Sequence, residues 1–145
     1  MSHENPVLIA SENIPTIWGG MAGKLLAGLQ LAAHGELTLA GIHAALCEGS
    51  NQLWIYHNEM DVQAWMVTSI ADYGSLKRLR LLLMGGEQLD KWLGHIDIVE
   101  RWAISLGCTE AEAWVRPGLR KKLDKFKYAK AYEVVLKKLE VKASN

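Results

Sequence analysis

The sequence has no excess charge of either sign, few cysteines and no long apolar run. Its 145 residues include 16 Lys plus Arg and 16 Asp plus Glu, so the formal net charge is zero. Because no overall positive field attracts polyanions, we do not expect nucleic acid as the main ligand or an anionic membrane surface as a partner. No stretch reaches the ~20 apolar residues of a membrane-spanning helix. We therefore expect no transmembrane segment.

The two cysteines, Cys47 and Cys108, are too few and too far apart for a metal knuckle or a disulfide scaffold. We interpret both as buried thiols in a reducing environment, and we expect no metal. The N-terminal stretch MSHENPVLIASENIP lacks the basic leader and apolar core of a secretion signal. The expected location is therefore inside a cell or a particle, without secretion through a signal peptide.

The length and composition fit one globular domain. Half of the residues are hydrophobic and 22% are charged, which is ordinary for such a domain. We predict a single domain over residues 1–145, with a short flexible tail over 140–145. The segment from Arg116 to Lys130 is rich in Lys and Arg, and it is either a local phosphate contact or the solvated side of a helix.

The first half of the chain changes from helical to strand periodicity. Thr38 is a candidate N-cap and Gly49 a candidate C-cap for one of the expected helices. Residues 52–57 and 62–70 are rich in β-branched and aromatic side chains, and a short turn-forming link separates them. This pattern predicts a β-hairpin. The predicted elements are a strand at 5–10, helices at 17–33 and 39–47, and hairpin strands at 52–57 and 62–70.

In the second half, a leucine-rich strand runs into a glycine pair and an amphipathic helix that Gly107 ends. Pro117 then opens a short helix. The predicted elements are a strand at 76–84, one helix at 89–106, a strand at 109–115, a short helix from 117 and a last strand at 131–139. The order β-α-α-β-β-β-α-β-α-β predicts an α/β (α+β) fold: a mixed, mostly antiparallel sheet flanked by helices.

Several segments together carry a family resemblance over the whole chain. They are LAGIHAALCEGSNQLWI, VTSI, LLLMGG, ERWAISLGC and RPGLRKKLDKFKYAKAYEVVLKKL. With the order of elements, they resemble the GNAT (N-acetyltransferase) superfamily, and in particular its small members encoded by tailed bacteriophages. The resemblance implies a wedge between two splayed central strands that binds acetyl-CoA. It also implies a pyrophosphate loop of pattern Gln/Arg-x-x-Gly-x-Gly/Ala at the start of the next helix.

In this chain the corresponding loop reads MGGEQLDKW. The resemblance assigns cofactor binding to Gly85, Gly86, Glu87 and Gln88, since glycines admit a close ligand and helix N-termini bind anions. The basic or amide residue and the later glycine of the pattern are absent. Glu87 and Asp90 place negative charge where the pyrophosphate would lie, with only Lys91 nearby in sequence. We therefore interpret the loop as vestigial and expect no cofactor.

The chain offers few candidates for catalysis. The resemblance places a tyrosine general acid at a position that is Leu123 here, and leucine has no proton to donate. The remaining candidates are His57 and Glu59, at the tip of the predicted hairpin, and Tyr128. A polar hairpin tip and a packing tyrosine explain the same residues without catalysis.

Three of the six tryptophans lie outside the apolar faces of the predicted helices and strands: Trp18, Trp102 and Trp114. Aromatic residues off the core often lie in contact surfaces, so these three are interface candidates. Coverage of the sheet by helices is the other explanation.

These observations favour a non-catalytic, phage-encoded structural component that has lost the acetyl-CoA site. It would be associated with the virion, in head–tail or tail assembly. We would then expect portal or tail proteins as partners, an oligomeric assembly, and location in the virion or host cytoplasm. The alternative is an acetyl-CoA-dependent N-acyltransferase with a divergent pyrophosphate loop, in which the base is Glu59, His57 or a water molecule.

Overall fold

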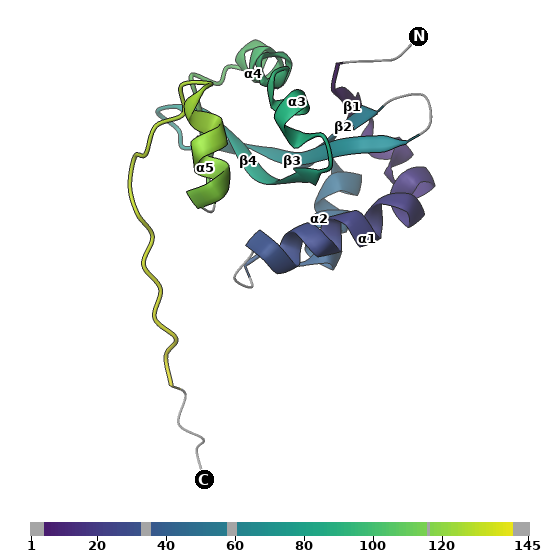
Figure 1. Ribbon diagram of the computed structural model, residues 1–145, viewed down its shortest axis with the longest axis horizontal. Coiled ribbons are helices and arrows are strands. Elements are labelled where there is room, and N and C mark those ends of the chain that lie inside the picture. The colour runs from purple at the N-terminus through teal and green to yellow at the C-terminus, as the bar shows by residue number, and fades with distance from the viewer. Residues whose placement is uncertain (1–4, 33–35, 58–60, 116, 141–145) are drawn as a thin grey trace.

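A five-stranded sheet forms the centre of the protein (Figure 1). The computed structural model describes residues 5–32, 36–57, 61–115 and 117–140. The strands lie in chain order; all neighbours are antiparallel except the last pair, which is parallel. The elements are β1 (Val7–Ile9), η1 (Ser11–Asn13), α1 (Ile14–Ala32), α2 (Leu39–Glu48), β2 (Asn51–His57), β3 (Val62–Asp72), β4 (Lys77–Gly86), α3 (Leu89–Leu93), α4 (Ile96–Ser105), β5 (Glu110–Ala113) and α5 (Pro117–Asp124).

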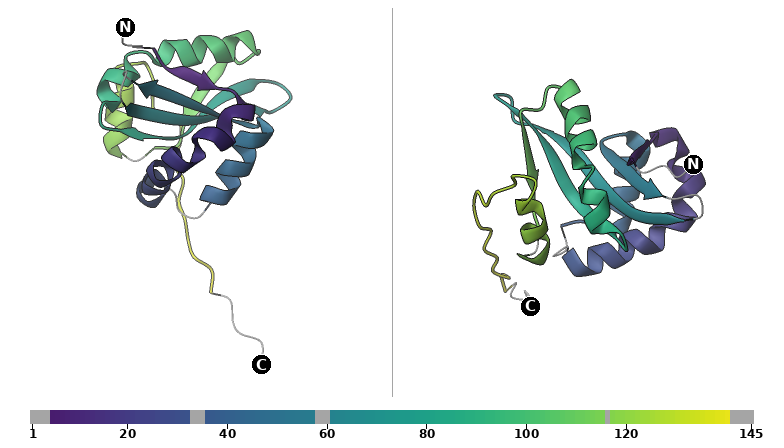
Figure 2. Two further views of the ribbon diagram at one scale, coloured as in Figure 1. Left: turned by 90° about the vertical axis from the view of Figure 1, so that its right-hand side faces the viewer. Right: turned by 45° about the horizontal axis from the view of Figure 1, so that its top comes forward.

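Helices cover both faces of the sheet, and each face has its own core (Figures 1 and 2). Successive side chains of a strand point to opposite faces. On β3, Met66 therefore joins the core under α3, α4 and α5, whereas Trp65 and Val67 join the core under α1 and α2. Both cores consist mainly of buried apolar side chains, so the central strands are largely apolar on both faces, although β3 also buries Thr68.

Trp65 sets how closely α1 approaches the sheet. A Cβ atom at Gly28 of α1 would lie 2.6 Å from the Cη2 atom of the Trp65 ring, and one at Gly85 of β4 would lie 2.9 Å from Cζ2. The indole is thus held between two glycines. At Gly86, φ is +126° and a Cβ would lie 2.4 Å from the Cα atom of Ala64. Gly86 therefore forms a steric corner at the end of β4.

The predicted helix after the glycine pair is two helices. α3 ends at Leu93 and α4 begins at Ile96, because His95 has a non-helical backbone with φ −110° and ψ 16°. Gly94, which disfavours helix continuation, precedes it. The buried residues keep helical spacing across the break, so periodicity alone did not reveal it.

The predicted fold class is confirmed, but the last predicted strand is absent. Residues 128–140 have no helix or strand, and from Tyr132 onward their large apolar side chains are exposed. The reason is that a strand needs a partner for its backbone groups, and no strand among the described residues pairs with this segment. The cysteine prediction is also half wrong, since Cys108 is buried but Cys47 is exposed. Within the described ranges, no helix combines the length and the apolarity needed to cross a membrane.

The close contact of Gly28 with Trp65 predicts a position-specific effect of alanine in α1. Gly28→Ala should lower the free energy of unfolding by about 1–3 kcal/mol, because the added methyl group overlaps a buried ring. The matched control is Gly20→Ala in the same helix, where a Cβ meets nothing within 4 Å. This control should gain up to about 1 kcal/mol through helix propensity. Urea unfolding measures both, and equal effects of the two variants would contradict the prediction.

Candidate functional site: a cavity where two central strands part

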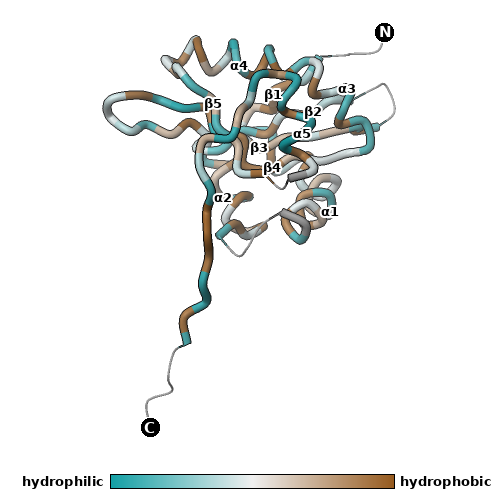
Figure 3. Tube along the Cα trace, turned by 60° about the vertical axis from the view of Figure 1, so that its left-hand side comes forward, coloured by the Kyte–Doolittle hydropathy of each residue, from teal (hydrophilic) through white to brown (hydrophobic). Residues whose placement is uncertain are grey.

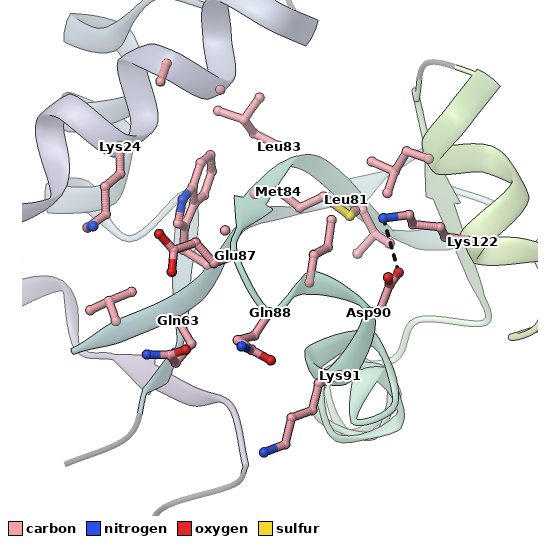
Figure 4. Close-up of a pocket in the computed structure, with 18 of the residues that line it drawn as sticks. Lys24, Gln63, Leu81, Leu83, Met84, Glu87, Gln88, Asp90, Lys91 and Lys122 are labelled. Atoms are coloured by element: carbon pink, nitrogen blue, oxygen red, sulfur yellow. Dashed lines mark ion pairs between the residues drawn. The ribbon is translucent and has the colours of Figure 1, made fainter. Parts of the chain in front are cut away.

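β4 and β5 pair over only part of the length of β4. Their register ends at Leu81 opposite Ala113, whereas β4 continues to Gly86. A cavity of about 660 Å³ lies at the parting (Figure 4). Small-molecule sites commonly measure roughly 300–1,000 Å³. The unpaired end of β4 therefore forms the wall of a ligand-sized cavity.

The backbone of β4 is irregular at the same place. Val67 of β3 faces Leu83 and Thr68 faces Leu81, so Leu82 has no partner in the register with β3. Such a bulge turns the backbone locally and is common beside active sites. Leu82 is also the first β4 residue beyond the pairing with β5, and it lines the cavity. Backbone groups of β4 on the β5 side are thus left without a strand partner at the cavity wall.

The cavity is lined from both helix layers. Lys24, Ala27 and Gly28 of α1 lie on one side of the sheet. Leu119 and Lys122 of α5, with the start of α3, lie on the other side (Figure 4). Two reactants could therefore meet in the opening from opposite faces of the sheet.

The electrostatic reason for calling the loop vestigial was incomplete. Lys122 Nζ lies 3.1 Å from Asp90 Oδ1, so α5 supplies a cation to one of the two carboxylates (Figure 4). Lys24 also lines the cavity, from α1. The described lining residues include three lysines and three carboxylates: Lys24, Lys91 and Lys122, and Asp61, Glu87 and Asp90. The site does not carry the net negative charge inferred from the loop alone.

The four residues predicted to bind a cofactor all line the cavity, and their backbone roles differ. The N–H groups of Glu87 and Gln88 donate to the carbonyl oxygen of Gln63, at 2.9 and 3.3 Å. Those two amides fasten the corner to β3. The first N–H groups of a helix have no intrahelical acceptor. In this loop, the backbone N–H that could donate to a ligand is therefore at the start of α3, from Leu89.

The candidates for catalysis lie elsewhere. His57 ends β2, and Glu59 lies outside the described residues. Tyr128 donates from its hydroxyl to Glu100 Oε2 at 2.7 Å, and burial together with this hydrogen bond raises the pKa of Tyr128. Neither His57 nor Tyr128 is a lining residue of the cavity. Leu123, where the sequence resemblance placed a tyrosine acid, is a buried core residue.

The three tryptophans have different surroundings. Trp18 stacks on His43 with ring centroids 4.3 Å apart, and Trp102 meets Trp54 edge-on at 5.3 Å. Trp114 is 54% exposed at the rim of the cavity, with the Arg80 guanidinium 5.5 Å from its ring centroid. Trp114 is therefore the one of the three that also belongs to the candidate site.

Sequence reasoning missed Lys24 and Trp65 as site residues, because both are distant in sequence from the glycine loop and no local motif marks them. Lys122 belongs to the basic segment from Arg116 to Lys130, for which a local phosphate contact was one of the two interpretations. In the parts of the chain that the structure describes, no three His, Cys, Asp or Glu side chains gather as metal ligands.

No protein-family model matches the chain, and no curated protein matches it in sequence. Solved structures do match its fold. The aminoglycoside N-acetyltransferase AAC(6')-Iy in complex with CoA has a TM-score of 0.68 at 15% identity, covering 96% of each chain. A ribosomal-protein-alanine N-acetyltransferase from Brucella melitensis biovar Abortus 2308 has a TM-score of 0.69 at 8% identity, covering 93% of this chain and 99% of that one. A predicted acetyltransferase with acetyl-CoA from Clostridium acetobutylicum has a TM-score of 0.67 at 11% identity, covering 95% and 96%.

These neighbours correct the main functional expectation. The prediction of a non-catalytic structural component is wrong, because the matching structures are acetyltransferases, some with CoA or acetyl-CoA bound. Nothing in the comparisons points to a phage or a virion. At sequence identities of 8–15% the structural likeness shows the fold. The chain has the GNAT fold, as the sequence resemblance predicted.

The environment of Tyr128 predicts how the protein behaves in alkali. The raised pKa keeps its phenol protonated in the folded state at pH values where an unfolded tyrosine, with a pKa of about 10, ionises. Stability from this group is therefore full below pH ~10 and falls above it. We expect wild type and Tyr128→Phe to show equal phenolate absorbance while folded and to differ by one phenolate after unfolding. A difference in the folded state would contradict this.

Proposed function

We propose that the protein is an acetyl-CoA-dependent N-acyltransferase. The observation that carries the proposal is the parting of β4 from β5 with a cavity between them. Supporting it are the GNAT fold and structural neighbours that bind CoA. A phage origin stays a prediction of the sequence resemblance. Because acetyl-CoA is a metabolite of the cell interior, we expect the protein to work in a cytoplasm.

The residues at the parting fit an acyl-CoA molecule. The pantetheine arm carries amide groups, and the unpaired backbone of β4 beyond Leu81 can hydrogen-bond to them as a partner strand would. The diphosphate would meet the corner between β4 and α3, where Leu89 begins the helix and its N–H group has no intrahelical acceptor. Lys122 of α5 and Lys91 of α3 are both lining residues, and they offset the negative charge of the loop.

The β4 bulge is the element we assign to catalysis. When bound, acetyl-CoA supplies an activated acetyl thioester. The acceptor amine would attack its carbonyl carbon to form a C–N bond, the oxygen would gain negative charge, and the C–S bond would then break to release the CoA thiolate. An N–H group of the bulged backbone at Leu82 or Leu83, unpaired by β5, would donate to that oxygen. Removing one such donor typically costs an enzyme about 100- to 1,000-fold in rate.

Proton transfer is assigned to water. The groups with a shifted pKa, Arg78, Cys108 and Tyr128, do not line the cavity. Leu123 cannot protonate the leaving thiolate. The amine would therefore lose its proton, and the thiolate would gain one, through solvent in the open cavity, unless His57 or Glu59 serves as the base.

The acceptor would enter from the α1 side. Lys24, Ala27 and Gly28 border that opening, and Trp114 stands at its rim. The acceptors named for the neighbours are an aminoglycoside and the alanine of a ribosomal protein, both of which present an amine. We propose that the acceptor of this chain is also an amine.

Acetyl-CoA binding measured by isothermal titration calorimetry tests the proposal. We expect a dissociation constant in the micromolar range. Lys122→Ala should weaken binding about 3- to 10-fold, because it removes a cation and leaves Asp90 without its partner. The control is Lys121→Ala, which removes the same charge from the same helix at a residue that does not line the cavity. Absence of binding at millimolar acetyl-CoA would refute the proposed function.

A further inference from the structure

The C-terminal segment leaves the body of the protein with its apolar side chains in solvent. Figures 1 and 2 show it as a long extension beyond the sheet. It is held at its start by the hydrogen bond from Tyr128 to Glu100 and by one from the Tyr132 hydroxyl to Glu112 Oε2 of β5, at 3.2 Å. Beyond Glu133, the described residues 134–140 have no hydrogen bond or ion pair to the rest of the chain.

The sequence of this segment is that of a strand. AYEVVLKKL contains two adjacent valines and two leucines, and neither glycine nor proline. Val135 is 89% exposed, and Leu139 79%. Figure 3 shows the apolar stretch as a brown section of the extended tail. Such a cluster of exposed aliphatic side chains marks a contact surface rather than a solvated tail.

The sheet has an open edge that such a strand would complete. β5 is the last strand of the order β1-β2-β3-β4-β5 and pairs with β4 alone among the described residues. Its outer edge therefore carries backbone N–H and C=O groups without a strand partner, which proteins normally cover. The chain thus contains a segment with the sequence of a strand that is unpaired, residues 131–139, and an edge strand, β5, whose outer side is also unpaired.

We propose that the segment Ala131–Leu139 pairs with β5 of a second copy of this chain, and that the exchange is reciprocal. The tail is joined to its own β5 by the hydrogen bond from Tyr132 and then leads away from the body, so it is directed beyond its own sheet. A reciprocal exchange of one element between two identical chains closes on itself and needs no new surface. It pairs both open edges and covers both exposed tails at once.

The oligomeric state of the full chain tests this exchange. We expect a dimer by size-exclusion chromatography with light scattering. Val135→Pro should raise the dimer dissociation constant at least about 100-fold, because proline lacks the N–H group of a paired strand. The matched control, Val135→Thr, keeps a β-branched residue and should remain dimeric. Because Val135 is almost fully exposed, neither variant should disturb the fold of the single chain, which circular dichroism checks.

Hydrogen exchange separates pairing between copies from pairing within one chain. We expect amides of residues 131–139 to be protected in the dimer and to lose protection on dilution. Protection that does not depend on concentration would mean that the tail folds back on its own β5, and would overturn the proposal. A wild-type monomer, or a Val135→Pro variant as dimeric as Val135→Thr, would also overturn it. Acetyl-CoA binding is measured separately, so a failure of the proposed function leaves this test unaffected.

Discussion

The end of pairing between β4 and β5 is the constraint on which the site depends. Up to that point the two strands are fastened by their ladder and by side chains: Arg78 Nε lies 2.9 Å from Glu110 Oε1, and Arg80 Nε lies 3.2 Å from Glu112 Oε1. Immediately afterwards, β5 ends and β4 bulges at Leu82. The sheet therefore opens at a defined residue, and the cavity is a consequence of where the ladder stops.

The cavity keeps its shape because the strand that forms its wall is packed on both faces. Trp65 fills the space between α1 and the end of β4, and only glycine at 28 and 85 leaves room for its ring. Gly86 ends β4, and Glu87 and Gln88, whose amides are bonded to Gln63 of β3, lead from it into α3. The glycine pair is thus required by the packing of the protein itself, and the ligand site that we propose lies beside it. A corner and a binding site are compatible roles for the same loop.

The charges of the site show why a loop cannot be judged from its own sequence. MGGEQLDKW appears acidic, and that impression supported the wrong functional expectation. The compensating Lys122 and the additional Lys24 come from α5 and α1, which only the fold brings to the cavity. Coulombic interaction depends on distance in space, so sequence neighbours are a poor guide to the potential at a site built from five elements.

The sequence by itself determined the fold class, the hairpin of β2 and β3, the strand that ends in the glycine pair and the start of α5 at Pro117. These features depend on local periodicity, caps and turn residues, which each segment carries within itself. Only the tertiary structure decided the break at His95, the parting of β4 from β5, the lysines around the cavity and the unpaired state of the segment 131–139. Each of these depends on what another part of the chain places alongside, and the last segment is unpaired because none of the five strands of the sheet lies beside it.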